Sequence, residues 1–365
     1  MNDGPRDPQS AVSEDSATEA AVSVVVPVKS SHATIRRLCE SLLHQTVPPL
    51  EIILVGDPDD STWIPIRDLI DGRRLRTIEV TRPAHHYGRD SNLKRRAGCD
   101  AACGGIIAVT DSDMVLPKDW LKTGIEILQS NAVDSVAGII LSRPQTDRPA
   151  EDFLDRYTDR SLLSKTPRFT EGVVVDKGSF GRHQHLPISA NWFFTRKAYE
   201  RSGGFDPSFT LSYEDYSFAW QMVSAGHRIL CTNQLVGYHC HRHRFAGLIK
   251  EYVKSGRGCA MFMWRYPASP LTRRRLAQLL ALGAVVVLTG VALLRWPSIT
   301  LVVALSMLFS ASLLNLRAAG RPGLLFPPVS LILGSAFTYG AIRGLVKGGR
   351  ACPKDQYYTN MHPRN

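Results

Sequence analysis

The amino-acid sequence predicts an α/β domain with a mostly parallel sheet, followed by helices that enter a membrane. Two observations support this prediction. In the first two thirds of the 365 residues, short apolar runs rich in β-branched side chains alternate with segments of helical period. In the last third, three long runs carry no charged side chain. Apolar strands without polar alternation, separated by helices, are typical of a parallel sheet that is covered on both faces.

Four apolar runs are expected to form strands: residues 22–28, 51–55, 106–110 and 133–141. Between the first two, residues 34–43 place Ile35, Leu38 and Leu42 on one face of a helix, as a helix that covers a sheet requires. Such sheets bind ligands beyond the carboxyl ends of their strands. Polar side chains at these ends are therefore the candidates for a functional site.

The three uncharged runs are residues 276–294, 296–316 and 322–342. Each is long enough to cross a bilayer, which takes ~20 apolar residues. The short break between the first two predicts a tight helical hairpin. The third run contains Pro327 and Pro328, and for it an interfacial or re-entrant segment is the alternative to a full crossing.

The positive charge of the chain is concentrated in its last third. The net charge is +11, but residues 252–365 carry fourteen Lys and Arg against one acid, whereas residues 1–251 carry thirty basic and thirty-two acidic side chains. Arginines 273–275 precede the first uncharged run, and Arg317 and Arg321 follow the second. The positive-inside rule then places the front domain in the cytoplasm and the chain in the plasma membrane as a multi-pass protein. No nucleic-acid partner is expected, because the front domain is near neutral.

Other features of the chain agree with a cytoplasmic domain. Residues 1–20 are acidic and polar, lack the apolar core of a secretory signal peptide, and are expected to be a disordered tail. The seven cysteines are scattered without a C-x-x-C pair, which indicates reduced thiols.

A third full crossing conflicts with Arg343, Lys347 and Arg350, because it would place them outside.

Acidic residues follow two of the expected strands. Asp57 comes after the second, and Asp111-Ser112-Asp113 comes directly after the third. Two carboxylates at positions i and i+2 of an extended segment point to one face, and a divalent cation between them offsets their repulsion. Mg²⁺ and Mn²⁺ take one or two carboxylates together with substrate phosphates. The alternative is an N-cap for the helix expected to start near Pro117.

Two further pairs are candidates. Glu214 and Asp215 stand at the expected start of a helix, where one carboxylate in a cleft is suited to act as a general base. The positive end of a helix dipole also favours acids there without any catalytic role. Lys94 and Arg95 lie in a helix upstream of the Asp pair, where they either meet a diphosphate or form a solvated basic face.

His239 and His241 belong to a dense run of His, Cys and Arg. Structural zinc needs four ligands, usually in two separated pairs, and no partner pair is visible in the sequence. One of these histidines is instead a candidate for completing the metal site of Asp113, and we expect His239. The alternative is a solvated basic connector.

Taken in order, these segments resemble glycosyltransferase family 2, whose members are inverting enzymes of the GT-A fold that use nucleoside-diphosphate sugars. The segments of this chain that are similar to the family are listed here with the family's own pattern in brackets: residues 22–29 (V-V-x-P), 51–60 (E-I-I-V-V-D-D-G-S), 96–104 (R-N-x-G-x-x-x-A-x-G), 111–113 (D-x-D), and a late block at 191–196, 203–206 and 214–215. The resemblance spans about residues 22–260.

The resemblance implies a role for each matching residue. It implies that Asp57 reads the nucleobase beside Pro27, and that Asp111 and Asp113 meet the ribose and the metal–diphosphate group. It makes Asp215 the catalytic base, with Glu214 as the second candidate. Trp192 would line the sugar or acceptor pocket, and His239 would help to hold Mn²⁺ or Mg²⁺.

The sequence also departs from the family pattern. Gly56 replaces the first acid of the D-D pair, Pro58 stands where Gly is usual, and Arg96 stands where Asn is frequent. The Q-x-x-R-W motif of processive synthases is absent, since Arg257 is followed by GCAMFMW. A non-processive enzyme is therefore expected. Residues 173–187 contain Gly, His and Lys and are expected to be a mobile lid over the donor.

The expected organisation is a tail (1–20), a GT-A domain (21–245), a basic interfacial connector (246–275), a transmembrane region (276–346) and a C-terminal tail (347–365). The membrane segments imply a lipid-linked or other glycan acceptor, as in cell-envelope polysaccharide synthesis. The alternatives are a membrane-anchored nucleotide-sugar-binding protein and a nucleotidyltransferase on the same fold.

Overall fold

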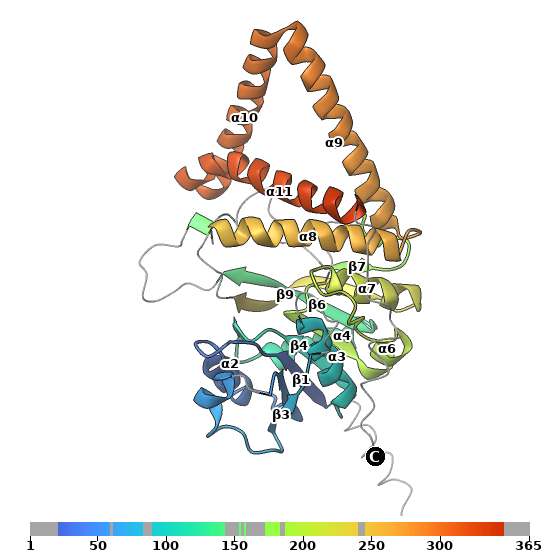
Figure 1. Ribbon diagram of the computed structural model, residues 1–365. Helices are drawn as coiled ribbons and strands as arrows, with labels where there is room; N and C mark the ends of the chain where they lie inside the picture. The colour runs from blue at the N-terminus through green and yellow to red at the C-terminus, as the bar shows by residue number, and fades with distance from the viewer. Residues whose placement is uncertain are drawn as a thin grey trace, which may run out of the picture.

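The computed structural model describes residues 21–58, 61–82, 90–142, 153–154, 157, 172–182, 187–239 and 245–346. Its parts form layers (Figure 1). A sheet domain lies at one end, followed by two long helices side by side, α8 (Phe245–Arg265) and α11 (Phe326–Val346). Beyond them a hairpin of α9 (Pro270–Arg295) and α10 (Pro297–Ala319) points away from the sheet.

The described part of the domain is built on a nine-stranded mixed sheet, in the order β3-β2-β1-β4-β8-β6-β9-β5 with β7 paired to β9. The strands are β1 (Val22–Pro27), β2 (Glu51–Gly56), β3 (Leu75–Glu79), β4 (Ile106–Thr110), β5 (Met114–Val115), β6 (Ser135–Ser142), β7 (Val173–Val175), β8 (Asn191–Thr195) and β9 (Ile229–His239). β1 to β4 run parallel, and β8 runs antiparallel between β4 and β6. The four expected strands are confirmed as β1, β2, β4 and β6.

Helices cover both faces of this sheet, which explains why its central strands are apolar throughout. In β1, Val24 and Val26 pack in one core cluster with Ile35, while Val25 packs in the other with Cys99. The helices of the domain are α2 (Ile35–Leu43), α3 (Ser91–Ala101), α4 (Trp120–Ser130), α6 (Arg196–Arg201) and α7 (Glu214–Ser224), with 3-10 turns η1 (Ser61–Ile66) and, between α10 and α11, η2 (Arg321–Leu325).

The parallel strands end together at one edge of the sheet. Pro27 at the end of β1 is in register with Val55 of β2, and Val25 with Val109 of β4. The residues that follow these strands, among them Asp57 and Asp111, therefore come out at the same edge. This edge faces the candidate site.

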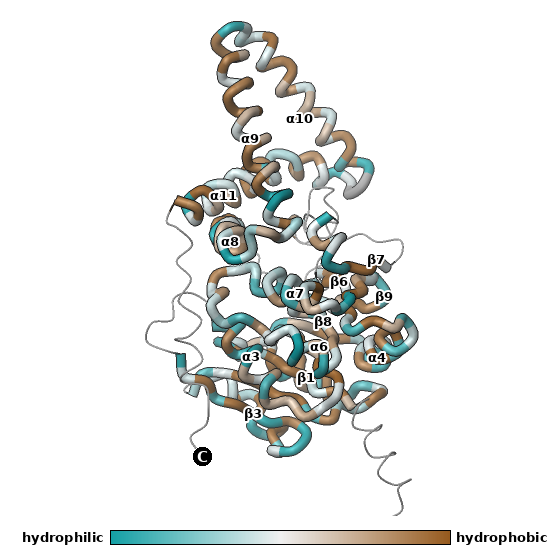
Figure 2. Tube along the Cα trace, turned by 90° about the vertical axis from the view of Figure 1, so that its right-hand side faces the viewer, coloured by the Kyte–Doolittle hydropathy of each residue, from teal (hydrophilic) through white to brown (hydrophobic). Residues whose placement is uncertain are grey.

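Three described helices are long and apolar enough to cross a membrane. Of the most apolar 18-residue stretch of each helix, 0% is buried in α9 and 6% in α10. Figure 2 shows both helices as largely hydrophobic. The third span, from η2 into α11, differs: 28% of its window is buried, and α11 lies along α8 instead of continuing the hairpin (Figure 1). The choice between a full crossing and an interfacial segment for the third uncharged run stays a prediction.

Glycines allow α8 and α11 to approach closely. A Cβ on Gly256 of α8 would collide with the carbonyl oxygen of Phe337, and a Cβ on Gly340 of α11 with the carbonyl oxygen of Val253. Small residues at such positions let two helix backbones come into contact. The contact fixes α8, which also borders the candidate site, to the membrane-proximal helix.

Replacing Gly340 by valine is expected to separate these helices and to destabilise the protein by about 1–3 kcal/mol, because a methyl group cannot be fitted against a backbone carbonyl. The measurement is the thermal midpoint of the detergent-purified protein. Gly334→Val is the matched control on the same helix, since nothing lies within 4 Å of a Cβ at Gly334. Equal midpoints for the two variants would contradict the close contact.

Candidate active site

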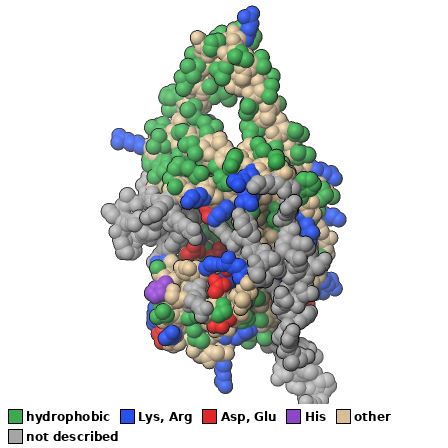
Figure 3. Space-filling view, viewed as in Figure 1, with side chains coloured by type: hydrophobic (Ala, Val, Ile, Leu, Met, Phe, Trp, Pro, Cys, Tyr) green, Lys and Arg blue, Asp and Glu red, His purple; other side chains and the backbone are tan. Residues whose placement is uncertain are grey.

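A cavity of about 850 Å³ opens at the carboxyl ends of β1 and β4, between the start of α3, the start of α7 and the first turns of α8. Figure 3 shows Asp and Glu side chains gathered in a hollow between the sheet domain and the helices beyond it, with Lys and Arg at its rim. The cavity brings together most residues expected from the sequence: Pro27, Lys94, Arg95, Asp111, Asp113, Glu214, Asp215 and His239.

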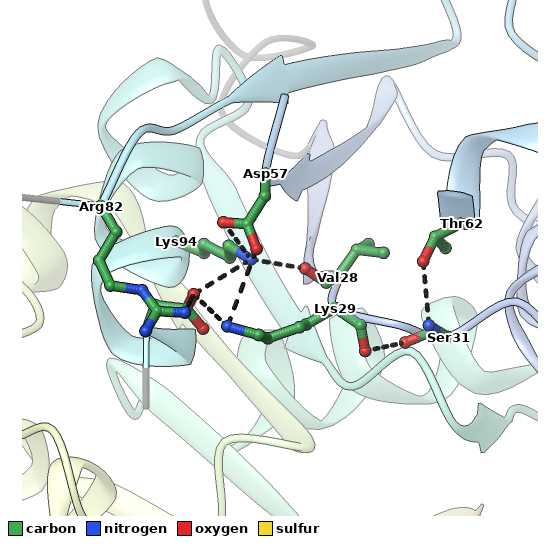
Figure 4. Close-up of polar contacts among 8 residues, drawn as sticks. Val28, Lys29, Ser31, Asp57, Thr62, Arg82 and Lys94 are labelled. Carbon is green, nitrogen blue, oxygen red and sulfur yellow. Dashed lines mark hydrogen bonds and ion pairs between the residues drawn. The ribbon is translucent and has the colours of Figure 1, made fainter. Parts of the chain in front are cut away.

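One end of the cavity is organised around Lys94, whose side chain is 1% exposed. Its Nζ donates a 2.8 Å hydrogen bond to the Val28 carbonyl oxygen and lies 3.0 Å from Asp57 Oδ1 and 3.5 Å from Asp90 Oδ2 (Figure 4). Lys94 therefore holds two carboxylates in place. Asp57 is fixed in this way beside the cavity, although it does not line it.

Asp90 is the second carboxylate of this network, and it was not among the expected residues. Its Oδ2 also lies 2.9 Å from Lys29 Nζ and 2.9 Å from Arg82 Nη2. Burial raises the pKa of Asp90, but the Lys29 hydrogen bond and the nearby cations outweigh it, so the pKa lies below its usual value. Asp90 is therefore ionised at neutral pH and balances the buried Lys94.

The structure explains why Gly56 departs from the family pattern. A Cβ at this position would overlap the indole ring of Trp63, whose Cη2 would lie 2.8 Å away. Trp63 packs over the end of β2 where the first acid of a D-D pair would stand. Of the two acids in the family's D-D pair, this chain therefore keeps only the second, Asp57.

Asp113 and His239, the two residues expected to hold a metal ion, lie side by side. His239 Nε2 lies 3.1 Å from Asp113 Oδ2. The contact follows from the topology, because the short strand β5 after the D-x-D segment pairs with β9 and sets Met114 opposite His239. His241 lies outside the described residues.

An imidazole nitrogen and a carboxylate oxygen that converge in this way fit Mn²⁺ or Mg²⁺ when further oxygens come from a substrate. The described residues contain no group of three or more His, Cys, Asp and Glu side chains that could hold a metal ion. The protein would thus supply two ligands, and a diphosphate would have to supply others.

Arg95 connects the D-x-D segment to the acids of α7. Its side chain is 5% exposed, and it lies 2.7 Å from Asp111 Oδ1 and 3.4 Å from Glu214 Oε1. These contacts join α3, the end of β4 and α7, which are far apart in the sequence. Arg95 thereby fixes the distance between the candidate donor site and the candidate base.

Asp215 has the electrostatic environment of a general base. Burial raises the pKa of Asp215 to about 7, and the charge of Glu214 acts in the same direction, against the Arg95 guanidinium and a hydrogen bond from Ser189. Its Oδ1 is shielded from solvent and has no hydrogen-bond partner among the described residues. Tyr213 precedes the helix with a φ of 71°, a left-handed turn that directs the chain into α7. An oxygen poised in this way can accept a proton at neutral pH.

Two expectations about residues 173–196 are corrected. Trp192 does not line the cavity: it is fully buried in the core against Phe194 and Phe218, and its Nε1 donates to Ser135 Oγ. Residues 172–182 are not a free lid, because β7 pairs with β9 and Phe180 is fully buried. Residues 183–186 lie outside the described residues.

Sequence reasoning also missed lining residues on α8, namely Gly247, Leu248 and Glu251. The charged stretch around them was expected to be a basic connector at the membrane surface. The one feature of the sequence that could have indicated these lining residues was Glu251, the single acid in a segment otherwise rich in Lys and Arg.

The family model described as "Glycosyl transferase family 2" matches residues 23–201. The pre-mycofactocin glycosyltransferase of Mycobacterium tuberculosis is 26% identical over 247 residues, which is 67% of this chain and 48% of that protein. The glucosyl-dolichyl phosphate glucuronosyltransferase of Haloferax volcanii is 24% identical over 190 residues, which is 51% of this chain and 56% of that protein. The chain thus spans about half the length of these relatives.

A solved structure is similar over most of the chain. The mannosyltransferase from Pyrobaculum calidifontis, in complex with GDP-Man and Mn²⁺, superposes with a TM-score of 0.60 at 17% identity and covers 90% of this chain and 87% of that one. At this identity the likeness shows the fold. It confirms a GT-A-like domain at the N-terminal side of the long apolar helices.

Proposed function

We propose, on the premise that this chain belongs to glycosyltransferase family 2, that it is an inverting, metal-dependent hexosyltransferase. It moves a sugar from a nucleoside-diphosphate sugar to a hydroxyl or phosphate of a membrane or lipid-linked acceptor in cell-envelope glycan synthesis. The observation that carries this proposal is the single cavity in which Asp113 and His239 lie on one side and Asp215 on the other, joined through Arg95.

The proposed chemistry divides the cavity between donor and acceptor. Asp57 and Pro27 bind the nucleoside, and Asp111 with Arg95 positions the donor toward Asp215. Asp215 takes a proton from the acceptor hydroxyl, and that oxygen attacks the anomeric carbon from the face opposite the nucleoside diphosphate, so the configuration inverts. No protein nucleophile is needed. A metal ion held by Asp113 and His239 would supply positive charge at the departing diphosphate.

The acceptor class follows from the long helices. The uncovered apolar surfaces of α9 and α10 support insertion into a bilayer, so an acceptor held in the membrane is within reach of the cavity. The arginines at both ends of the hairpin favour a cytoplasmic catalytic domain in the plasma membrane. The missing Q-x-x-R-W motif supports a non-processive transfer.

The experiment that tests this function is donor cleavage. Detergent-purified protein is offered a panel of UDP- and GDP-sugars with Mn²⁺ or Mg²⁺, with and without membrane lipid extract, and the released nucleoside diphosphate is measured. We expect release from one donor and its loss in Asp113→Ala. Silence of every donor under both conditions would support the binding-protein alternative, and release of pyrophosphate from a sugar phosphate and a nucleoside triphosphate would support a nucleotidyltransferase.

The pH dependence of kcat/KM is expected to report Asp215. A base works only when ionised, so activity should rise with pH and reach half of its maximum near the pKa of about 7. Because the charge of Glu214 raises this pKa, Glu214→Gln is expected to move the midpoint to lower pH. Release of nucleoside diphosphate between pH 5.5 and 9 measures both profiles. A midpoint near 4 in the wild type, or no shift in the variant, would contradict the assignment.

A further inference from the structure

The turn that carries the candidate base directs its side chains to two sides. Glu214 and Asp215 line the cavity, whereas the tyrosines that flank them in sequence, Tyr213 and Tyr216, are not among its lining residues. The centroids of the two tyrosine rings lie 4.5 Å apart. Tyr213 is 3% exposed, and its ring centroid lies 6.0 Å from that of Phe262 in α8. The two tyrosines therefore form the back of the turn, on the side away from the cavity.

Arg275, in the first turns of α9, reaches the back of this turn. Its guanidinium group is hydrogen-bonded to Tyr213, and its charge interacts with the hydroxyl groups of both Tyr213 and Tyr216. Because a guanidinium group can only donate, the Tyr213 hydroxyl oxygen accepts this bond. Arg275 Nη1 also donates a 2.9 Å hydrogen bond to Gln278 Oε1, and the guanidinium carbon lies 5.8 Å from the centre of the Phe337 ring in α11. The membrane-side helices thus hold this cation behind the turn.

The helix α8 contacts the same segment on both sides of the carboxylates. A Cβ on Gly258 would lie 2.6 Å from the carbonyl oxygen of Ser212, so the backbones approach closely before the turn. After the turn, the hydroxyl oxygens of Ser217 and Tyr266 lie 2.9 Å apart. At this end α8 is followed directly by α9 (Figure 1). Residues 212–217 are therefore supported by α8 and α9 from one side and face the cavity on the other.

The backbone conformation of the turn needs such support. Tyr213 has a φ of 71°, in the left-handed region that residues other than glycine rarely adopt. A residue stays in this region only when the surrounding structure holds it there. Tyr213 directly precedes Glu214 and Asp215, so relaxation of its backbone would rotate the first turn of α7 and displace both carboxylates. A displacement of about 1 Å at a reacting group is enough to slow an enzyme about a hundredfold.

We propose that Arg275 is a positioning residue for the transfer reaction: through the Tyr213 hydroxyl it holds the left-handed turn that places Asp215 in the cavity. This inference rests on the proposed function and deepens it, because it makes the geometry of the candidate base depend on α9. The same helix continues from Arg275 into the first apolar run of the hairpin. Correct seating of the membrane hairpin against the domain is then a condition for catalysis, beyond its role as an anchor.

The first test is Arg275→Gln in the full-length, detergent-purified protein. Release of nucleoside diphosphate is measured with the UDP- or GDP-sugar that the donor panel identifies, in the presence of membrane lipid extract. We expect kcat to fall at least about tenfold while the donor KM stays within about twofold, because the base moves and the donor site does not. Arg273→Gln is the matched control, since it removes the same charge from an exposed neighbour on the same helix, and it should keep the wild-type kcat. An unchanged kcat in Arg275→Gln, a loss that Arg273→Gln shares, or a loss that appears in the donor KM instead overturns the inference.

The second test is Tyr213→Phe, which keeps the buried ring and removes the hydroxyl to which Arg275 and Cys259 are hydrogen-bonded. We expect the same fall in kcat at an unchanged donor KM, and the double variant should lose no more than the weaker of the two single variants, because both changes break one contact. Fold losses that multiply in the double variant, or a wild-type kcat in Tyr213→Phe, overturn the inference even where Arg275→Gln does not fold. If the wild-type protein releases no nucleoside diphosphate from any donor, it is the proposed function that fails, and this inference fails with it.

Discussion

Replacement of Asp215 by asparagine is expected to lower the rate of sugar transfer by about a thousandfold, the effect of losing a general base. The carboxylate is placed for this role by the start of α7, with one oxygen shielded and unpartnered. Asparagine has nearly the same shape and cannot take the proton. The measurement is the single-turnover rate with saturating donor and acceptor, because this rate reports the chemical step.

Binding and folding are the controls for this variant. The nucleoside diphosphate should bind Asp215→Asn with unchanged affinity, since the donor site lies across Arg95. The carboxylate has a folded-state pKa of about 7 against 3.8 for an exposed aspartate, so stability is lost as pH rises from 3.8 to about 7 and does not fall further from this group above that. At pH 8 the variant should thus melt no lower than the wild type. A thousandfold loss in Glu214→Gln with little loss in Asp215→Asn would assign the base to Glu214.

The site residues that follow the parallel strands are predictable from sequence. Apolar runs identified β1, β2 and β4, and parallel strands must end at one edge, so Asp57, Asp111 and Asp113 were expected to lie near each other. The pairing of Arg95 with Glu214 was not expected, because it joins residues 119 positions apart and depends on how α7 packs. Periodicity reports the face of a helix that is buried, not the element that covers it.

The same limit explains the residues that were misassigned. Trp192 belongs to a strand without polar alternation, and in a sheet covered on both faces such a pattern does not separate core from cavity. Lys94 was expected at a diphosphate or on a solvated face, and the solvated face is wrong because Lys94 is buried against Asp57 and Asp90. α11 is long and apolar enough to cross a membrane, and its sequence pattern did not show that Gly340 lets it pack on α8. Composition does not encode tertiary contacts of this kind.

Removal of the His239 side chain is expected to raise the Mn²⁺ concentration required for half-maximal activity by at least about tenfold, with partial recovery at saturating metal. In the proposed function His239 is one of two protein ligands, and in its absence Asp113 and the donor would still hold the ion. Asp113→Asn should be more severe and should not recover, because it removes the charge that attracts the cation. Metal titrations of nucleoside diphosphate release measure both variants.

The chain provides a matched control for this experiment. His227 Nδ1 lies 3.1 Å from Asp134 Oδ1, the same kind of pair at the same distance as His239 and Asp113, but it lies outside the cavity lining. His227→Ala should leave the Mn²⁺ dependence unchanged. The two pairs differ in position, not in residue type: Asp113 and His239 line the cavity, and Asp134 and His227 do not. Full activity of the wild type after exhaustive chelation would contradict a metal at this pair.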